Sequence, residues 1–205
     1  MSFHSGYAAL VGRPNVGKST LLNCLIGQKL AITSHKPQTT RHRILGILSQ
    51  DGGQVVFVDT PGIHDRGDTA MGHYLNRTAY SALRDVDVIV FVVQALAWTS
   101  EDERVLRAIG EAAVPTIAVV NKVDLVEPKE QLLPFLQDLS DRHHFEDIVP
   151  VSALRRDNTQ TLIQTVLHRL PEGEGAPGMN AYARYLRLAL RCQDEVDTYL
   201  KFYGG

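Results

Sequence analysis

The sequence has little cysteine and little net charge. Cys24 and Cys192 are the two cysteines, and they stand far apart rather than in a C-x-x-C pair. This excludes a disulfide framework and a cysteine-based zinc site, and it fits a reducing cytosol. The formal net charge of -2 gives no overall attraction to nucleic acid or to an anionic membrane. Such contacts would need a local patch.

Long hydrophobic runs are also missing. The amino-terminal stretch MSFHSGYAAL has no basic segment before a long apolar core, and no uncharged run approaches membrane-spanning length. We therefore expect a cytoplasmic protein with no transmembrane segment. The 205 residues, 44% of them hydrophobic, suffice for one substantial domain and leave too few residues for a second of ordinary size.

What the chain does contain is an alternation of short valine-rich runs with longer amphipathic ones. The runs predict strands at residues 7–11, 55–58, 86–93, 114–120 and 148–151. They predict helices at residues 18–26, 71–83, 101–112, 129–143 and 159–170. Ser100 and Glu103 have the spacing of a capping box. This alternation predicts an α/β fold with a mostly parallel sheet covered on both faces.

One pair of predicted strands differs. Residues 43–49 and 54–59 are joined by Gln50-Asp51-Gly52-Gly53, which is short enough for an antiparallel hairpin at a sheet edge, so the sheet is predicted to be mixed. Further along, PEGEGAPG at residues 171–178 indicates a linker. We therefore predict a domain over residues 1–170, this linker, and a helical tail over residues 179–205.

GRPNVGKST, residues 12–20, follows the first predicted strand and opens the first predicted helix. It fits G-x-x-x-x-G-K-[ST], a loop whose backbone N–H groups converge on polyphosphate oxygens while the helix adds the positive end of its dipole. The motif fits kinases, ATPases and GTPases alike. The nucleotide-binding residues predicted here are Gly12, Asn15, Val16, Gly17, Lys18, Ser19 and Thr20.

DTPG, residues 59–62, follows another predicted strand. Ligands collect at the carboxyl ends of parallel strands, so Asp59 is expected on the same edge as the phosphate loop. Its carboxylate and the Ser19 hydroxyl can hold Mg²⁺, and the Gly62 N–H can reach the γ-phosphate. Read alone, the tetrapeptide is also a good turn.

NKVD, residues 121–124, indicates which base is bound. The Asp124 carboxylate can accept from the N1–H and the 2-amino group of guanine, whereas adenine would leave it unpaired, which disfavours an ATPase. Asn121 would tie this segment to the phosphate loop, and the Lys122 stem would lie over the base. Without its neighbours the tetrapeptide would be a solvated turn.

Ser152, Ala153 and Leu154 follow the last predicted strand, where the Ala153 N–H could meet guanine O6. Three such common residues have little specificity alone. Their weight comes from order, because all four motifs fall directly after a predicted strand.

This order of motifs resembles the Ras-like GTPase superfamily over roughly the first 170 residues. The longer stretches at residues 12–47, DTPGIH, NKVDLV and DIVPVSAL are similar to the Era family of bacterial GTPases, in the TrmE-Era-EngA-like branch; KPQTTRHRILGI at residues 36–47 is the most specific of them. The resemblance implies a three-layer P-loop GTPase fold that binds GTP or GDP with Mg²⁺.

The resemblance also implies two switch segments. Residues 36–43 would be switch I, with Thr40, or else Thr39, reaching Mg²⁺ when GTP is bound. Residues from Thr60 to about Leu75 would be switch II. On their own, the two threonines could equally be ordinary residues at the start of a strand.

For hydrolysis, the residues assigned are Lys18, Thr40, Gly62 and Asn15. Ile63 stands where many Ras-like proteins have a catalytic glutamine, so slow intrinsic hydrolysis is expected. His64, the next residue, could substitute for the glutamine, but a histidine in a polar loop is more often simply solvated. Related GTPases use an asparagine at the place of Asn15 to hold K⁺; the alternative for Asn15, a turn former, stays open.

A hydrolysing switch is therefore favoured over a non-hydrolysing binding module, since Lys18, Ser19 and Asp59 are all intact. The resemblance further implies a part in small ribosomal subunit assembly and 16S rRNA processing, and it allows peripheral association with the inner face of the cell membrane. Era-like proteins carry an RNA-binding KH domain, which needs a G-x-x-G loop. Residues 179–205 have no such loop and are too short for the fold.

The predicted tail has a stripe of Arg184, Arg187 and Arg191 with Tyr182 and Tyr185 beside it. The stripe could touch phosphate, although a solvated helix face is the favoured interpretation. We therefore expect only weak, salt-sensitive binding of ribosomal RNA by this chain.

Overall fold

The structure is a computed structural model, and it describes residues 2–27, 43–59 and 83–173. In chain order its elements are β1 (Phe3–Val11), α1 (Lys18–Ile26), β2 (Arg43–Gln50), β3 (Gly53–Asp59), β4 (Val88–Gln94), α3 (Ser100–Ala112), β5 (Thr116–Asn121), the 3₁₀ turns η1 (Val123–Leu125) and η2 (Lys129–Gln131), α4 (Leu132–Arg142), β6 (Asp147–Pro150), α5 (Thr159–His168) and β7 (Glu172–Gly173).

The strands form one mixed sheet in the order β2-β3-β1-β4-β5-β6. Pairing is parallel from β3 through β6, and β2 pairs with β3 antiparallel at the edge, as the hairpin prediction requires. The short β7 pairs antiparallel with the start of β1. Because β3 and β4 lie on opposite sides of β1, the strand order changes direction at β1, which is where ligands bind in open α/β sheets.

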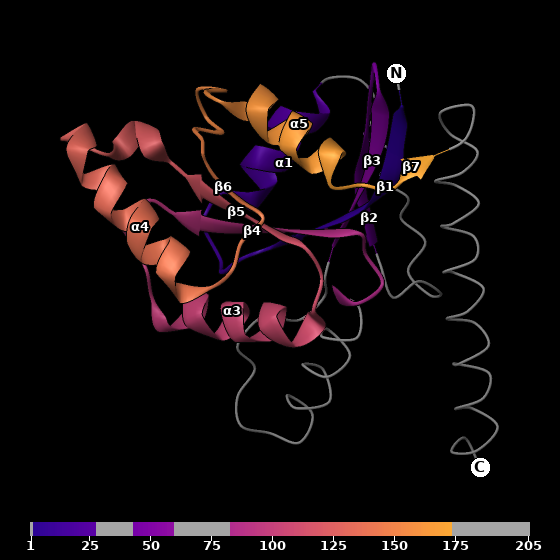
Figure 1. The fold of residues 1–205 in the computed structure, drawn as a ribbon. Helices are drawn as coiled ribbons and strands as arrows, with labels where there is room; N and C mark the ends of the chain where they lie inside the picture. Colours follow the sequence, from indigo (N-terminus) through magenta and orange to yellow (C-terminus); the bar gives the residue numbers. More distant parts are fainter. Residues whose placement is uncertain (1, 28–42, 60–82, 174–205) are drawn as a thin grey trace, which may run out of the picture.

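Helices cover both faces of the sheet, which confirms the three-layer α/β prediction (Figure 1). On one face, Leu10 and Val90 pack with Leu25 of α1 and Val166 of α5. On the other face, alternate strand residues pack with α3 and α4. That second cluster includes Ala9, Phe91, Val120, Leu106 and Leu139. Both faces of the central strands are buried, which explains their nearly continuous apolar runs.

The element predictions are largely confirmed, with differences at several element bounds. Strand β1 begins at Phe3, four residues before the predicted start. The predicted capping box at Ser100 and Glu103 is wrong by one residue: Thr99 is the N-cap of α3, and its reciprocal partner is Asp102. The predicted helix at residues 71–83 lies outside the described residues except for its last residue.

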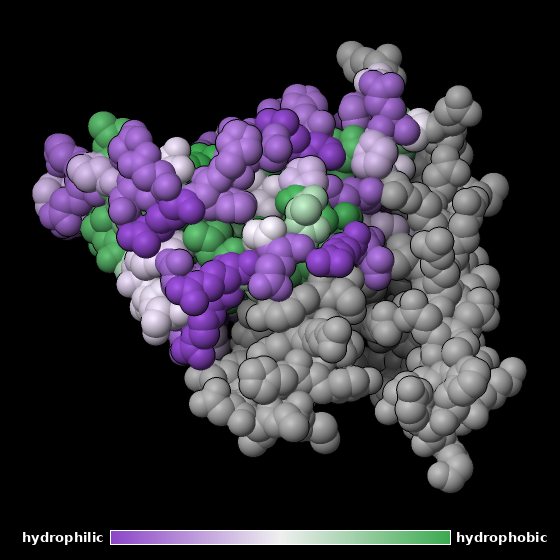
Figure 2. Space-filling model, turned by 60° about the horizontal axis from the view of Figure 1, so that its bottom comes forward, coloured by the Kyte–Doolittle hydropathy of each residue, from purple (hydrophilic) through white to green (hydrophobic). Residues whose placement is uncertain are grey.

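Residues 172–173 of the predicted linker form β7. The linker beyond residue 173 and the predicted tail lie outside the described residues, so the division of the chain stays a prediction. Within the described ranges, no helix is both long and apolar enough to cross a membrane. On the face shown in Figure 2, hydrophilic residues cover most of the described surface, and the hydrophobic ones form small separate patches.

Candidate functional site

Five parallel strands end at one edge of the sheet, and the predicted motifs follow directly from them. Strand β1 leads into the phosphate loop, β3 ends at Asp59, and β5 ends at Asn121. Strand register places Asp59 beside Leu10, two residues before Gly12. The fold thus gathers motifs that are more than a hundred residues apart in sequence.

The phosphate loop has a backbone shape that depends on glycine. Gly12 has a φ of 147° and Gly17 a φ of 99°, both in the region that side chains rarely adopt. A Cβ on Gly12 would also collide with the carbonyl oxygen of Val92, and one on Gly17 with the side-chain amide of Asn121. Asn15 has a φ of 63°, which asparagine tolerates better than most residues. This geometry accounts for the two glycines and agrees with the interpretation of Asn15 as a turn former.

Helix α1 begins at Lys18, directly after the loop. Among the described residues no side chain caps its amino terminus, and its first turn holds no acidic residue. The N–H groups of the first turn and the helix dipole therefore favour an anion at this end. The Lys18 ammonium donates to the carbonyl oxygens of Gly12 and Arg13, at 2.7 Å each. Ser19 and Thr20 are exposed in the same turn.

Two residues of the NKVD segment hold the phosphate loop in place. The buried Asn121 donates from Nδ2 to the carbonyl oxygen of Val16 at 2.9 Å, which is the tie predicted from the sequence. Lys122 donates from Nζ to the carbonyl oxygen of Asn15 at 2.7 Å and to Oε1 of Gln94 at 2.9 Å. Gln94 was not predicted as part of the site.

Hydrogen bonds join the NKVD segment to the segment of Ser152, Ala153 and Leu154. The Ser152 hydroxyl, which is buried, donates to Oδ1 of Asp124 at 2.6 Å and so orients that carboxylate. The Ala153 N–H, expected to serve guanine O6, donates to Oδ1 of Asn121 at 3.0 Å. A bond to O6 would therefore have to share this N–H or replace the bond to Asn121. Leu154 is exposed.

Several predicted residues lie outside what the structure describes. Thr40, Gly62 and both switch segments fall in residues 28–42 and 60–82, apart from Arg43 at the start of β2. Only the backbone of Asp59 is described. A hydroxyl from Ser19 and a carboxylate at the end of β3 are the hard oxygen donors that Mg²⁺ prefers, and both positions lie on this edge. The donor set thus fits the metal.

Sequence reasoning missed Arg13, the second residue of the phosphate loop. Its guanidinium Nε donates to Oδ2 of Asp102 at 2.9 Å, and its Nη2 donates to the carbonyl oxygen of Ala97 at 3.1 Å. An arginine beside a proline in a loop carries no local signal of such a contact, because its partner is 89 residues away.

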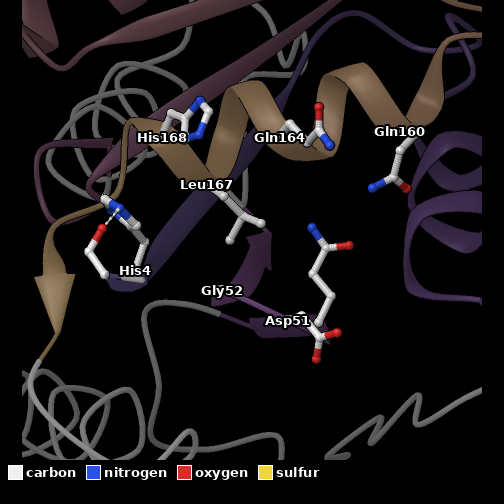
Figure 3. A pocket seen from close by; sticks show the side chains of 9 residues that line it. His4, Asp51, Gly52, Gln160, Gln164, Leu167 and His168 are labelled. Carbon is white, nitrogen blue, oxygen red and sulfur yellow. Dashed lines mark hydrogen bonds between the residues drawn. The ribbon is translucent and has the colours of Figure 1, made fainter.

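A separate cavity of about 680 Å³ lies at the opposite end of β1, between α5 and the β2–β3 hairpin (Figure 3). Its lining residues are mostly neutral and polar, and among them His4 donates from Nδ1 of its ring to the carbonyl oxygen of Leu170 at 2.9 Å. None of the predicted site residues that the structure describes lines this cavity. The candidate site is therefore the edge of the sheet that carries the phosphate loop.

Comparison with known families supports the same region. A family model described as 50S ribosome-binding GTPase matches residues 7–122. The GTPase Era of Azotobacter vinelandii is 53% identical over 173 residues, which cover 84% of this chain and 58% of that protein. The GTPase Era of Ectopseudomonas mendocina is 54% identical over 169 residues, covering 82% of this chain and 56% of its own length. The chain thus spans less than two thirds of either relative.

Solved structures agree with the sequence comparisons. A variant of Aquifex aeolicus Era bound to GDP·AlF4⁻ is 41% identical with a TM-score of 0.69, covering 84% of this chain and 59% of its own. Era in complex with MgGDPNP and nucleotides of 16S ribosomal RNA is 40% identical with a TM-score of 0.70, covering 85% and 59%. The G domain of the Thermotoga FeoB iron transporter, 19% identical with a TM-score of 0.60 over 81% of this chain and 99% of its own, shares the fold.

Proposed function

Because the chain belongs to the family described as 50S ribosome-binding GTPases, we propose that it binds guanine nucleotide with Mg²⁺ and hydrolyses GTP to GDP and phosphate. The observation that carries the proposal is the set of hydrogen bonds linking the NKVD segment to the phosphate loop. Asn121 contacts both Val16 of the loop and Ala153 of the fourth motif, so one buried amide joins the three segments.

The roles proposed for the individual residues follow from their chemistry. The loop N–H groups and the Lys18 ammonium bind the phosphates. Asp124, held by Ser152, accepts from the guanine edge. Ser19, Asp59 and Thr40 would hold Mg²⁺, which when bound neutralises charge on the phosphates. Gly62 contributes an N–H to the γ-phosphate. The missing glutamine at Ile63 supports a slow intrinsic rate.

Phosphate release from GTP in the presence of Mg²⁺ tests this proposal. A Lys18→Ala variant should lose the activity, because the ammonium nearest the loop carbonyls is gone. Arg107→Ala, which removes an exposed cation from α3, serves as the control and should keep it. GTP binding without phosphate release in the unmodified protein would instead support a non-hydrolysing binding module.

We also propose that K⁺ accelerates hydrolysis more than Na⁺ does, with the Asn15 side chain as a ligand that replaces the charge of an arginine finger. Asn15→Gly is a sharp test, because glycine accepts the φ of 63° and removes the amide without straining the loop. The variant, like Asn15→Ala, should bind nucleotide but hydrolyse it equally in both salts. Equal rates in the unmodified protein would remove Asn15 from the mechanism.

For the protein in the cell we propose a part in small ribosomal subunit assembly and 16S rRNA processing, in the cytoplasm and with peripheral contact to the inner face of the membrane. The support for the ribosomal part is the likeness to Era proteins, one of which has a structure in complex with 16S ribosomal RNA. The membrane contact rests on the resemblance alone. Co-sedimentation with anionic lipid vesicles tests it, and recovery of all protein in the supernatant would contradict it.

A further inference from the structure

We propose that Arg13 and Asp102 form a positioning pair that fixes the phosphate loop against the amino terminus of α3 and thereby slows nucleotide release. The inference rests on the nucleotide binding proposed above and adds residues outside the predicted site. Neither side chain need touch the nucleotide. Both act through the shape of the loop.

Asp102 is fully buried, and three donors converge on one of its oxygens. Oδ2 accepts from Arg13 Nε at 2.9 Å, from the Thr99 backbone N–H at 3.0 Å and from the Thr99 hydroxyl at 2.9 Å. Its other oxygen, Oδ1, is buried and has no hydrogen-bond partner among the described residues. A carboxylate removed from water needs a compensating charge, and Arg13 supplies one. Asp102, which takes part in the capping box of α3, therefore also fixes the phosphate loop through Arg13.

Arg13, the partner of Asp102, also contacts Lys18 through its backbone. Arg13 reaches Asp102 and the carbonyl oxygen of Ala97 with its guanidinium, and its own carbonyl oxygen accepts from Lys18 Nζ at 2.7 Å. The Arg13 side chain is 15% exposed, so solvent hardly competes for it. A shift of Arg13 would therefore move a backbone oxygen that the proposed phosphate-binding lysine contacts.

The loop is consequently held from two sides. Segments after β5 hold its far part, through Asn121 on Val16 and Lys122 on Asn15. The segment after β4 holds its near part, through Asp102 on Arg13. Within this anchored stretch Asn15 has a φ of 63°, which a residue other than glycine keeps only where its surroundings fix it. Releasing the near anchor should let the loop relax and separate its N–H groups.

The rate at which a fluorescent GDP analogue leaves the full chain in Mg²⁺ tests the proposal. The variants are Arg13→Met, Asp102→Asn and the double variant. Val105→Ala is the matched control, because Val105 is buried on the same helix and has no polar contact with the loop. Melting temperature is measured for every variant, so that lost stability and faster release can be told apart.

Each single variant should release the analogue about tenfold faster, and the double variant also about tenfold, because both changes cut the same tie. Val105→Ala should melt earlier yet release within about twofold of the unmodified rate. Arg13→Lys keeps the positive charge but loses the planar guanidinium and its several N–H donors, so its release rate should be intermediate. If Asp102→Asn does not fold, the two Arg13 variants still decide the outcome.

The proposal is overturned if folded single variants release the analogue at the unmodified rate. It is also overturned if the double variant is about a hundredfold faster, which would mean independent effects, or if Val105→Ala matches the Arg13 variants, which would reduce the pair to a stability role. An unmodified chain that binds no GDP would refute the proposed function instead of the pair.

Discussion

The Asp124 carboxylate is oriented by a hydroxyl from another loop, so its hydrogen-bonding pattern can be changed without moving the backbone. Asp124→Asn should weaken GTP binding and improve binding of xanthosine triphosphate, because xanthine has a carbonyl where guanine has its 2-amino group. A loss of about tenfold or more in GTP affinity is expected, and competition binding measures it. If the variant keeps the unmodified preference for GTP, Asp124 does not read the base.

His143 offers a second prediction for a single residue. Its ring packs edge-on against Phe145, with 5.0 Å between centroids, and burial, followed by the charge of His144, lowers the pKa of His143 from its ordinary value of 6.5. The folded state then binds this proton less tightly than the unfolded chain does. Protonation therefore favours unfolding, and stability should fall as the pH drops through and below about 6.5.

Urea unfolding at pH 7.5 and at pH 5.5 measures this loss. His143→Gln should show a smaller drop between the two conditions, because glutamine cannot take up the proton. An identical drop in both proteins would show that His143 does not contribute. No motif in the sequence indicates this environment, because the contact of the His143 ring with Phe145 depends on how the chain folds after α4.

At the scale of elements, α3 contains a glycine with no structural need to be one. Gly110 lies inside the helix, and a Cβ there would meet no atom of the described residues outside the helix's own backbone within 4 Å. Gly110→Ala should raise the free energy of unfolding by roughly 0.5–1 kcal/mol, because alanine loses less backbone freedom on folding. Chemical denaturation gives the difference directly.

Gly53→Ala is the natural counterpart to that change. A Cβ on Gly53 at the start of β3 would lie 2.6 Å from the carbonyl oxygen of His4 and 2.6 Å from the Leu167 side chain. This variant should be destabilised by about 1–3 kcal/mol, as expected for overpacking. If both glycine variants shift stability in the same direction, the packing described for one of these positions is wrong.

The elements show why local patterns locate a helix well and its first residue less well. The spacing of three residues that marks a capping box occurs twice in succession, at Thr99 with Asp102 and at Ser100 with Glu103. Burial of Asp102 and its ion pair with Arg13 favour the pair Thr99 and Asp102. Neither feature can be read from a short stretch of sequence. Likewise, β1 begins earlier than its apolar run because pairing with β3 and β7 extends it back to Phe3.

For the whole molecule, the sequence was sufficient to predict the three layers, the parallel core of the sheet and the hairpin at its edge. Each of these features depends on hydrophobic periodicity and on the length of the connections. It also sufficed for the tie between Asn121 and the phosphate loop, because the order of motifs along the sheet implies it. Contacts such as Arg13 with Asp102, or Lys122 with Gln94, depend on side chains from different connections meeting in space. Spacing within one segment cannot predict them.

The charge of the whole molecule bears on RNA. With a net charge of -2, this chain should bind a labelled oligonucleotide of the 16S rRNA 3′ end weakly at physiological salt, and the affinity should fall steeply as salt rises. Fluorescence anisotropy titrations at two salt concentrations measure both properties. Tight, sequence-selective binding would contradict this prediction and would show that residues 179–205, or the GTPase domain itself, read RNA.

The pairing of β7 with β1 has a mechanical consequence. β7 meets β1 antiparallel at Phe3 and His4, with one further bond from the Ser5 N–H to the carbonyl oxygen of Pro171. Tension pulling residue 173 away from the sheet would load these few bonds one after another, like a zipper. The parallel pairing of β1 with β3, from His4 to Leu10, would instead be loaded in shear along its whole length. A pull from the segment after residue 173 should therefore peel β7 away before it disturbs the strand that carries the phosphate loop.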